Sequence, residues 1–551
     1  MQTSDFFDRN VYLDILEKRT KAAKAGYRQN IAIIGDKDIG KTSVILHFLN
    51  QFNDPMILPL YLELGPELSW EQFVRKFIGS LLYNFLENSN VARNEDLDFL
   101  ISKASRFIPK TIEAIKLTLS LLKKRKSVQN LFIQLLSLCD ILNLETGKFC
   151  VIIFDEFHYL GTLGIKQIYK QFAKMLMIQK KVLYIILSSA KFKAKKILSS
   201  HLALLFGNFE IIEMQSFDLK TTEEFLSKRL AHLQMEKSLI DFLIHFTGGH
   251  PLYLKIITDS LLRFTSPVRN TTLPEGKTKI SNGTSPITKE KLAEIIQDLL
   301  FVESGILNQR FRLANLKLTQ DYQELLYLIA DGQNRLKDLA TNLHKSKTQI
   351  LSRLNLLLEY DVIDKSGDFF IISDRIFNFW LRFVYREKLN SLTFNTEEQK
   401  KNFRMKIEEK INQFILANRK SVLERMMELL HLFENELIQL RTKKFRLVQF
   451  QEIKPLTFLH SRLNEGLIAR SKDSLWIMAV KREALTEEDI VDFTKQCRRF
   501  HYAKPQKKVI VTNYSIDTNA RLKAMEEKVL TWNLDDLNLI LDLYNKPRVI
   551  L

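Results

Sequence analysis

Short apolar runs alternate with longer helical patterns between Asn30 and Met214, which is typical of a parallel sheet covered by helices. Five of these runs predict strands, at Ile31–Ile34, Ile57–Leu64, Phe149–Phe154, Val182–Leu187 and Glu210–Glu213. A long apolar insertion with helical periodicity separates the second strand from the third. It contains the basic run Lys123–Lys126, which we interpret as a solvated helix end.

Helical periodicity replaces the strands after Met214. Helices are expected at Thr221–Ala231 and Lys237–Phe246, and Gly248-Gly249-His250-Pro251 then gives a helix stop followed by a new helix start. This order predicts a helical lid. The segment Thr265–Pro286 is rich in Ser, Thr, Pro, Gly and Asn, and it is the clearest loop of the chain.

A compact unit is predicted from Leu316 to Tyr385, where three helices precede a hairpin around Gly367. This is the element order of a winged helix. The expected elements are helices Tyr322–Ala330, Leu336–Leu343 and Ser346–Tyr360 and strands Val362–Ile363 and Phe369–Ile372. Four aromatic residues follow at helical spacing and are interpreted as core, namely Phe377, Phe379, Trp380 and Phe383.

A helical connector is expected to reach about Arg441, and strands and helices alternate again from Phe445. The expected strands lie in FRLVQF, GLIARS, LWIMAV, KVIVTN and VLTW, and the expected helices lie around Asp489–Phe500, around Asn519–Lys528 and at the end of the chain. The pattern predicts a second, small α/β domain. The fold class is therefore α/β.

Composition supports a folded, soluble protein. The 551 residues suffice for about two to four domains, and 46% hydrophobic with 26% charged residues excludes extensive disorder. A formal charge of +18 favours polyanionic partners such as nucleic acid or an anionic membrane surface. The sequence shows neither a signal peptide nor an apolar run long enough to span a membrane, so a cytoplasmic location is expected.

The three cysteines, Cys139, Cys150 and Cys497, are far apart in the sequence and form no CxxC pair. We interpret them as reduced core residues rather than as a disulfide or a zinc site.

The segment GDKDIGKTS follows the first predicted strand and precedes a helix, and it satisfies the P-loop pattern G-x-x-x-x-G-K-[ST]. Its residues are Gly35, Asp36, Lys37, Asp38, Ile39, Gly40, Lys41, Thr42 and Ser43. Backbone amides of such a loop cradle phosphates at the positive end of a helix. Lys41 would neutralise β- and γ-phosphate oxygens, and the Thr42 hydroxyl would bind Mg²⁺. The segment therefore predicts a site for the phosphates of a nucleotide.

The apolar strand that contains Phe149–Phe154 ends in two carboxylates, Asp155 and Glu156, which is the Walker B pattern. Asp155 would hold Mg²⁺ through water, and Glu156 would polarise an attacking water. Ser188 ends the next strand, where many P-loop ATPases place a polar residue that senses the γ-phosphate; a plain strand-end serine remains the alternative. His158 is interpreted as an orienting or surface residue.

The P-loop, FDEFHYL, the SSA strand end, GGHPLYL and ISDRIFNFWLRFVY together resemble the archaeal-type ATPases, relatives of the STAND and AAA-type NTPases. The resemblance spans nearly the whole chain, because many members carry a carboxy-terminal domain similar to restriction endonucleases. It implies four parts, namely residues 1–215 as the P-loop ATPase core, 216–315 as helical lid and linker, 316–385 as the winged helix, and 386–551 as connector and nuclease-like domain.

Two departures from the family concern the amino-terminal part. Members begin with an arginine-x-x-glutamate element, of which only Arg9 is present. Members also carry an arginine after a Leu-aromatic-Gly run, whereas Asn208 follows that run here. An arginine finger contributes a factor of about a thousand or more to hydrolysis, so slow intrinsic turnover is expected.

A third departure concerns the carboxy-terminal domain, because nucleases of this kind need carboxylates and a lysine to cut a phosphodiester with a metal ion. Aligning the strands places Gly466 at the aspartate position, Ala479 at the glutamate position and Lys481 at the lysine position. Glu434 is a candidate match for an upstream acidic residue of the pattern, and Glu465 or Glu483 is a candidate substitute by a local shift. We favour a degenerate domain that binds a partner or DNA without cutting it; a purely structural domain is the alternative.

Candidate DNA contacts in the predicted winged helix are Lys345, Lys347, Gln349 and Arg353, on or just before its third helix. Residues 319–385 hold 8 Lys and Arg against 9 Asp and Glu, whereas residues 386–551 hold 31 against 23. This distribution favours DNA binding by the carboxy-terminal part, and a winged helix used only for protein packing remains open.

The sequence thus predicts an ATP-hydrolysing, Mg²⁺-dependent switch that is associated with DNA. ATP rather than GTP follows from the resemblance, since no NKxD element follows the sensor strand. One alternative is a regulatory or scaffold protein that retains nucleotide and binds a protein partner. An active metal-dependent nuclease is the weaker alternative.

Overall fold

The computed structural model describes residues 6–86, 96–123, 128–202, 209–265, 286–316, 319–386, 396–440, 443–458, 461–463, 465–500, 506–513 and 516–551. The chain divides into two compact units. Unit 1 comprises Met1–Phe217, His250–Leu252 and Glu359–Asp361, and unit 2 comprises the remaining segments up to Leu551. Most of the predicted loop Thr265–Pro286, most of the basic run Lys123–Lys126, and Asn208 lie outside the described residues.

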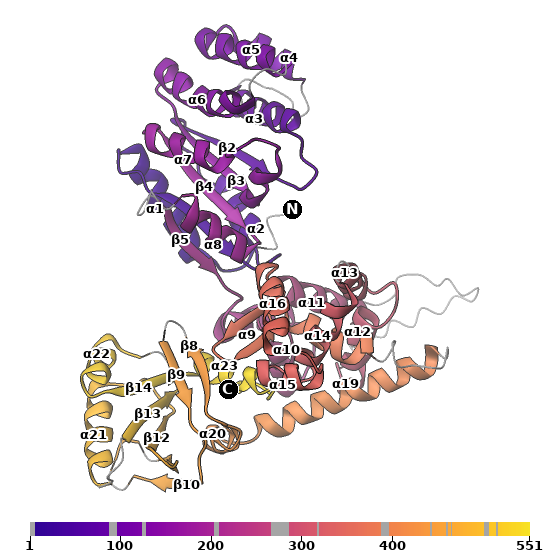
Figure 1. Cartoon of the computed structure of the whole chain (residues 1–551), viewed down its shortest axis with the longest axis vertical. Coiled ribbons are helices and arrows are strands. Elements are labelled where there is room, and N and C mark those ends of the chain that lie inside the picture. The colour runs from indigo at the N-terminus through magenta and orange to yellow at the C-terminus, as the bar shows by residue number, and fades with distance from the viewer. Residues whose placement is uncertain are drawn as a thin grey trace. The chain divides into compact units, whose positions relative to one another are not determined.

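Unit 1 is built on a parallel five-stranded sheet of order β2-β3-β4-β1-β5, which confirms the predicted α/β class (Figure 1). The strands are β1 (Asn30–Gly35), β2 (Ile57–Glu63), β3 (Phe149–Asp155), β4 (Val182–Ser188) and β5 (Phe209–Met214). All five predicted strands are present; the sheet buries β1, β3 and β4 on both faces, whereas the edge strands β2 and β5 keep exposed positions. The position of β4 between β1 and β3 brings the ends of these three strands together.

Helices cover both faces of this sheet (Figure 1). One face packs against α1 (Asn10–Lys24) and α2 (Lys41–Gln51) through residues such as Ile31, Ile33 and Ile153. The other face packs against the insertion helices and the two helices that follow β3 and β4. These are α3 (Trp70–Leu86), α4 (Leu97–Ala104), α5 (Pro109–Lys123), α6 (Val128–Thr146), α7 (Ile168–Ile178) and α8 (Lys191–Ser200).

Unit 2 begins with helices, as the sequence predicts. They are α9 (Leu219–Arg229), α10 (Lys237–Thr247), α11 (Pro251–Thr265), α12 (Lys289–Leu300) and α13 (Ile306–Leu316). Gly248 ends α10 in the left-handed conformation, with φ at 60°. A Cβ atom at this position would lie 2.5 Å from Cδ of Arg375, so both the backbone and the packing require glycine there.

The three helices predicted for the winged helix are present (Figure 1), and the predicted hairpin follows them in the chain. They are α14 (Gln320–Ala330), α15 (Leu336–Asn342), α16 (Lys347–Glu359), β6 (Ile363–Ser366) and β7 (Phe369–Ile372). The short helix α17 (Arg375–Trp380) follows, and its aromatic residues pack as core, with Trp380 only 1% exposed. The connector helices are α19 (Thr396–Asn418) and α20 (Val422–Leu430).

A second five-stranded sheet of order β10-β11-β12-β13-β14 forms the carboxy-terminal part, with α21 and α22 on one face and α20 and α23 on the other. The pairs from β10 to β12 are antiparallel, and those from β12 to β14 are parallel. The elements are β10 (Glu452–Thr457), β11 (Glu465–Arg470), β12 (Leu475–Lys481), α21 (Glu487–Arg498), β13 (Gln506–Thr512), α22 (Thr518–Glu526), β14 (Val529–Asn533) and α23 (Leu534–Leu543).

Two strands here differ from the sequence prediction. FRLVQF does not join the five-stranded sheet. Its first three residues belong to β9 (Lys443–Leu447), which pairs with β8 (Glu436–Leu440) in a separate hairpin. We expected β8 to be the end of a helical connector, but its residues alternate buried and exposed, as a strand requires. The prediction also missed β10, a strand at the edge of its sheet that contains Pro455.

Candidate functional site

The loop between β1 and α2 has the backbone that a phosphate cradle requires. A Cβ atom on Gly35 would lie 2.5 Å from the carbonyl oxygen of Met214, so only glycine fits where the loop leaves β1. Gly40 has φ of 102° and Asp38 has φ of 61°, and both therefore adopt the left-handed conformation as the chain turns into α2. Ile39 is buried, whereas Lys37 and Asp38 are exposed and Asp36 and Ser43 are half-buried.

Lys41 begins α2 and is only 4% exposed. Its Nζ donates hydrogen bonds to the carbonyl oxygens of Gly35, at 3.0 Å, and Asp36, at 2.8 Å. Burial lowers the pKa of Lys41, and the charges of Glu156 and Asp155 oppose this effect. The ammonium group is therefore held at the loop by both the backbone and the neighbouring carboxylates.

Asp155 ends β3 and forms hydrogen bonds both to the start of α2 and to the neighbouring strand β2. Its Oδ2 accepts hydrogen bonds from Thr42 Oγ1 at 2.6 Å and from Tyr61 OH at 2.8 Å. Its Oδ1 is buried and has no hydrogen-bond partner in the described part of the chain. A buried carboxylate oxygen without a partner is costly, so this atom suits a cation or its bound water.

The sequence analysis missed Tyr61, although its position on β2 contains a signal. Leu60 and Leu62 face one side of the sheet and pack against the insertion helices, so Tyr61 must face the other side. Because β2 pairs in parallel with β3, Tyr61 lies near the carboxyl end of β3. Burial raises the pKa of Tyr61, and the neighbouring Asp155 raises it further, so the hydroxyl remains a donor.

Glu156 follows Asp155 and has φ of 55°, a left-handed conformation that is strained for a residue with a side chain. Its Oε2 accepts hydrogen bonds from the backbone N–H of Ser189 at 2.8 Å and from Ser189 Oγ at 2.9 Å. Burial raises the pKa of Glu156, and the two Ser189 hydrogen bonds oppose this effect. The strand-end pattern predicts a role for Ser188 only, so this contact of Ser189 is not evident from the sequence.

Two basic residues contact the loop from other segments. The Arg9 side chain donates from Nη2 to the carbonyl oxygen of Ile39 at 3.2 Å, and its guanidinium carbon lies 4.5 Å from the centre of the Phe217 ring. The first residue of α8, Lys191, forms an ion pair with Asp36 at 2.6 Å. Arg9 thus supports the loop even though the acidic residue of the family's first element is missing.

The four candidate DNA residues near α16 differ in their surroundings. Arg353 and Lys345 form ion pairs with Asp321 at 2.6 and 3.7 Å. Gln349 makes reciprocal hydrogen bonds with Ser346 at the start of α16. Lys347 is exposed. Part of the proposed phosphate-binding charge is therefore neutralised within unit 2.

Strand β9 carries three exposed cations, Lys443, Lys444 and Arg446. None of them forms an ion pair with a residue in the described ranges. Their strand lies at the edge of a two-stranded sheet, where lysine also serves to prevent unwanted strand pairing.

The positions aligned with a nuclease centre are closed. Gly466 and Ala479 lie opposite each other on β11 and β12. A Cβ atom on Gly466 would lie 2.5 Å from Cε2 of Phe458, so the aspartate of the family pattern does not fit there. Lys481 is paired with the buried Asp489 at 3.3 Å and with Glu483 at 3.6 Å.

The two other candidate carboxylates bind arginines elsewhere in unit 2. Glu434 accepts from Arg335 at 2.7 Å and from Lys337 at 3.1 Å, and Glu465 accepts from Arg482 at 2.9 Å. Among the described residues, no group of three or more His, Cys, Asp or Glu side chains is arranged to hold a metal ion.

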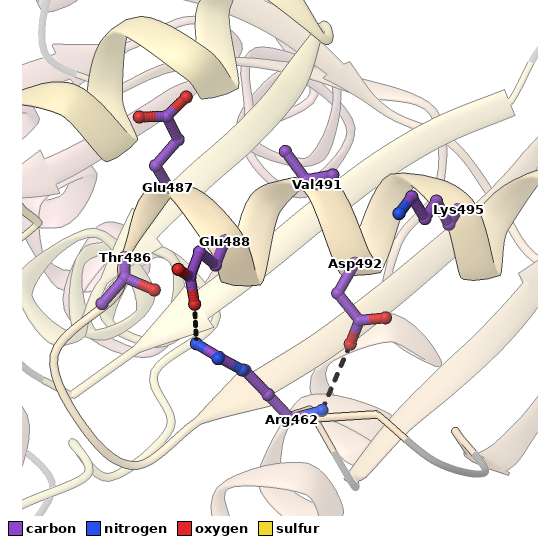
Figure 2. Close-up of a pocket in the computed structure, with 7 residues that line it drawn as sticks. All are labelled: Arg462, Thr486, Glu487, Glu488, Val491, Asp492 and Lys495. Atoms are coloured by element: carbon purple, nitrogen blue, oxygen red, sulfur yellow. Dashed lines mark hydrogen bonds and ion pairs between the residues drawn. The ribbon is translucent and has the colours of Figure 1, made fainter.

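A cleft of about 780 Å³ lies beside the start of α21 (Figure 2). Figure 2 shows Arg462 between two carboxylates of this helix; the Arg462 side chain pairs with Glu488, and its backbone N–H donates to Asp492 at 3.2 Å. The cleft contains none of the residues predicted to bind nucleotide. Two of its carboxylates, Glu488 and Asp492, are held by protein groups.

Comparisons with known proteins agree with the geometry of the loop. Residues 6–257 match the family described as an ATPase domain predominantly from Archaea, which identifies an ATPase domain in somewhat less than half of the chain. No curated protein matches the chain. Within the described residues, no helix combines the length and apolar character needed to cross a membrane.

Three solved structures are similar to the chain at low identity. A Walker-type ATPase of Pyrococcus abyssi is 18% identical with a TM-score of 0.46, and the match covers 69% of this chain and 97% of that one. The ORC2 protein of Aeropyrum pernix is 9% identical with a TM-score of 0.40, covering 74% and 95%. The RuvB branch migration motor of Thermotoga maritima is 12% identical with a TM-score of 0.32, covering 69% and 97%.

Proposed function

We propose that the chain binds ATP and Mg²⁺ at the loop Gly35–Ser43, hydrolyses the nucleotide slowly, and acts as a nucleotide-driven switch associated with DNA. The observation that carries the proposal is the state of Asp155. It lies at the carboxyl end of β3, contacts Thr42 at 2.6 Å, and keeps one buried oxygen without a partner. Ligands of α/β sheets bind at this end of the strands.

Each residue then has a definite role. The loop amides hold the phosphates, and Lys41 neutralises their charge. Thr42 and Asp155 hold Mg²⁺, a cation that proteins commonly bind through one or two side chains together with substrate phosphates. Bound Mg²⁺ would supply charge neutralisation at the phosphate oxygens. Ser188 is the sensor of the γ-phosphate.

Glu156 acts as the group that orients and polarises the attacking water. Its raised pKa follows from burial, and a carboxylate with raised basicity accepts a proton more readily. The hydrogen bonds from Ser189 keep one carboxylate oxygen in place, so the other oxygen is the one that accepts a hydrogen bond from the attacking water.

Steady-state ATP hydrolysis, measured with wild type and Glu156→Gln, tests this assignment. We expect slow turnover in the wild type and at least a 100-fold loss in the variant, since a positioned base contributes about 10²–10⁴. Binding of a fluorescent ATP analogue should survive in Glu156→Gln and disappear in Lys41→Ala. Equal turnover in wild type and Glu156→Gln would reject the role of Glu156.

The DNA-associated part of the proposal is supported by the positive charge of residues 386–551. Adding duplex DNA to the ATPase assay tests it, and we expect stimulation that weakens as salt rises. A different result would identify a scaffold with a protein partner: nucleotide would copurify with the chain, and its hydrolysis would be negligible with or without DNA. Metal-dependent DNA cleavage that Lys481→Ala abolishes would identify a nuclease, against which the closed surroundings of Gly466 argue.

The switch itself requires that the two units change their arrangement with the state of the nucleotide. Distances between dyes on the two units, measured with ATP, with ADP and without nucleotide, test this. The same distance in all three states would reject a switch.

A further inference from the structure

His158 is buried beside the proposed catalytic residues, although the proposed mechanism gives it no role. It lies on the 3₁₀ turn Phe157–Thr162 that follows β3, and it is 5% exposed. Its Nδ1 lies 2.9 Å from Ser188 Oγ and 3.3 Å from Glu156 Oε2. The ring packs against Tyr159, with 4.1 Å between the ring centres. One nitrogen atom therefore contacts both the proposed sensor and the proposed base.

The His158 ring is neutral at pH 7, so only one of its nitrogens carries a hydrogen. Burial lowers the pKa of His158 to about 4, and the charges of Lys193 and Lys41 act in the same direction. A hydrogen on Nε2 would leave the Nδ1 lone pair facing a carboxylate oxygen, which is repulsive. A hydrogen on Nδ1 is instead donated to Ser188 Oγ at 2.9 Å, and it presents a positive N–H to the Glu156 carboxylate at 3.3 Å.

This tautomer also decides what the Ser188 hydroxyl can do. With hydrogen on Nδ1, Ser188 Oγ accepts from the ring, and it also accepts from the backbone N–H of Ala190 at 3.2 Å. Its own hydrogen then points to another acceptor, and the Ala190 carbonyl oxygen lies at 3.3 Å, a long contact. The hydroxyl hydrogen is therefore weakly held and can be donated to a phosphate oxygen.

We propose that His158 is a positioning residue that holds the Glu156 carboxylate and orients the Ser188 hydroxyl through a single Nδ1–H group. The inference rests on the proposed ATP hydrolysis and extends it to a residue outside the Walker motifs. Through this ring, the group that detects phosphate is joined to the group that orients water.

Three substitutions separate this role from simple packing. In His158→Asn, the amide nitrogen takes nearly the place of Nδ1 and keeps the donor. In His158→Gln, the amide reaches toward the place of Nε2, and in His158→Leu the donor is absent. We expect kcat to fall about 10- to 100-fold in His158→Leu and His158→Gln, since small misplacements of catalytic groups cost this much, and to recover in His158→Asn.

The split between kcat and KM adds a readout that packing damage would not give. The phosphate-binding loop is untouched, so KM for ATP and the affinity for a fluorescent analogue should stay within about two-fold of wild type. The positioning role would be overturned if kcat stays at the wild-type value in all three variants. It would also be overturned if kcat falls by the same factor in all three, even where wild-type ATP hydrolysis is confirmed.

A spectroscopic measurement tests the hydrogen bond without any turnover. Ring ¹⁵N shifts of histidine-labelled full-length protein distinguish the Nδ1–H tautomer from the Nε2–H tautomer, and the His158 signals are assigned by their loss in His158→Asn. We expect Nδ1–H in the nucleotide-free protein; Nε2–H would overturn the inference. A wild type that never hydrolyses ATP would refute the proposed function and the catalytic role of His158 together, while the tautomer would still decide the hydrogen bond.

Discussion

Asp542 lies between two arginines in unit 2 and connects segments that are distant in the sequence. Its Oδ1 accepts from Arg375 Nη1 at 2.5 Å, and its Oδ2 accepts from Arg548 at 2.7 Å and 3.0 Å. Arg375 also donates to the carbonyl oxygen of His245 at 3.2 Å, near the end of α10. The Asp542 side chain is 18% exposed, so water screens these ion pairs only in part.

We predict that Asp542→Asn lowers the free energy of unfolding of unit 2 by about 2.5 kcal/mol at pH 7. Burial alone raises the pKa of Asp542, but Arg375 and Arg548 outweigh burial and lower it from 3.8 to about 2. This pKa difference between the unfolded and the folded chain corresponds to about 2.5 kcal/mol of folding free energy. The contribution is present above pH 4 and is lost as the pH falls toward 2. Asparagine keeps the shape but leaves two guanidinium groups without an opposite charge.

Tryptophan fluorescence during denaturant unfolding measures this change. Three of the four tryptophans, Trp380, Trp476 and Trp532, belong to unit 2, so a Trp70→Phe background makes the signal specific for that unit. The control is Asp473→Asn, an exposed carboxylate on the turn before β12 that should change stability by less than about 0.5 kcal/mol. If the free energy of unfolding of Asp542→Asn equals that of this control, the stabilising role of the Asp542 ion pairs is refuted.

Three further predictions concern other parts of the chain. Gly35→Ala should weaken nucleotide affinity at least ten-fold in a fluorescent-analogue titration, because its Cβ would meet a backbone oxygen at 2.5 Å; unchanged affinity would contradict the close approach. Burial lowers the pKa of His245 well below 6.5, so the unfolded chain takes up the proton first, and unit 2 should lose about 1.4 kcal/mol per pH unit below pH 6.5. His245→Asn should remove this dependence in the same fluorescence assay, and a persisting dependence would assign it to other groups. Alanine at the three exposed cations of β9 should reduce the slope of log affinity for duplex DNA against log salt by about 0.9 per lost phosphate contact; a larger reduction in Lys345→Ala/Lys347→Ala would favour the α16 residues instead.

The sheet of unit 1 and its loop were predictable because their signals are local. An apolar run that the sheet buries on both faces is visible in the sequence, and the loop pattern fixes glycines and a lysine at set spacings. Contacts that arise only when strands pair are harder to predict. Tyr61 reaches Asp155 because β2 lies beside β3, and Ser189 reaches Glu156 because β4 lies on the other side of β3.

The carboxy-terminal strands show a second limit. The residues of β8 alternate strictly, but the preceding helical pattern hides the change of period, and its partner β9 follows after only a few residues. Proline in β10 lowers its strand signal, and the edge position that tolerates proline is known only from the sheet order. Local pattern therefore identified the strands with strong apolar runs, including the edge strand β14, and missed β8 and β10.

Burial of all three cysteines has a practical consequence for testing the switch. Maleimide dyes react with the thiolate. Burial raises the pKa of the Cys497 thiol to about 12, and a hydrogen bond with Cys150, together with burial, raises the pKa of Cys139 well above its usual range. The native thiols should therefore remain unmodified while the chain is folded. Cysteines introduced at exposed positions, one in each unit, would be labelled selectively in an otherwise natural sequence, and unexpected labelling of a native thiol would itself report local opening.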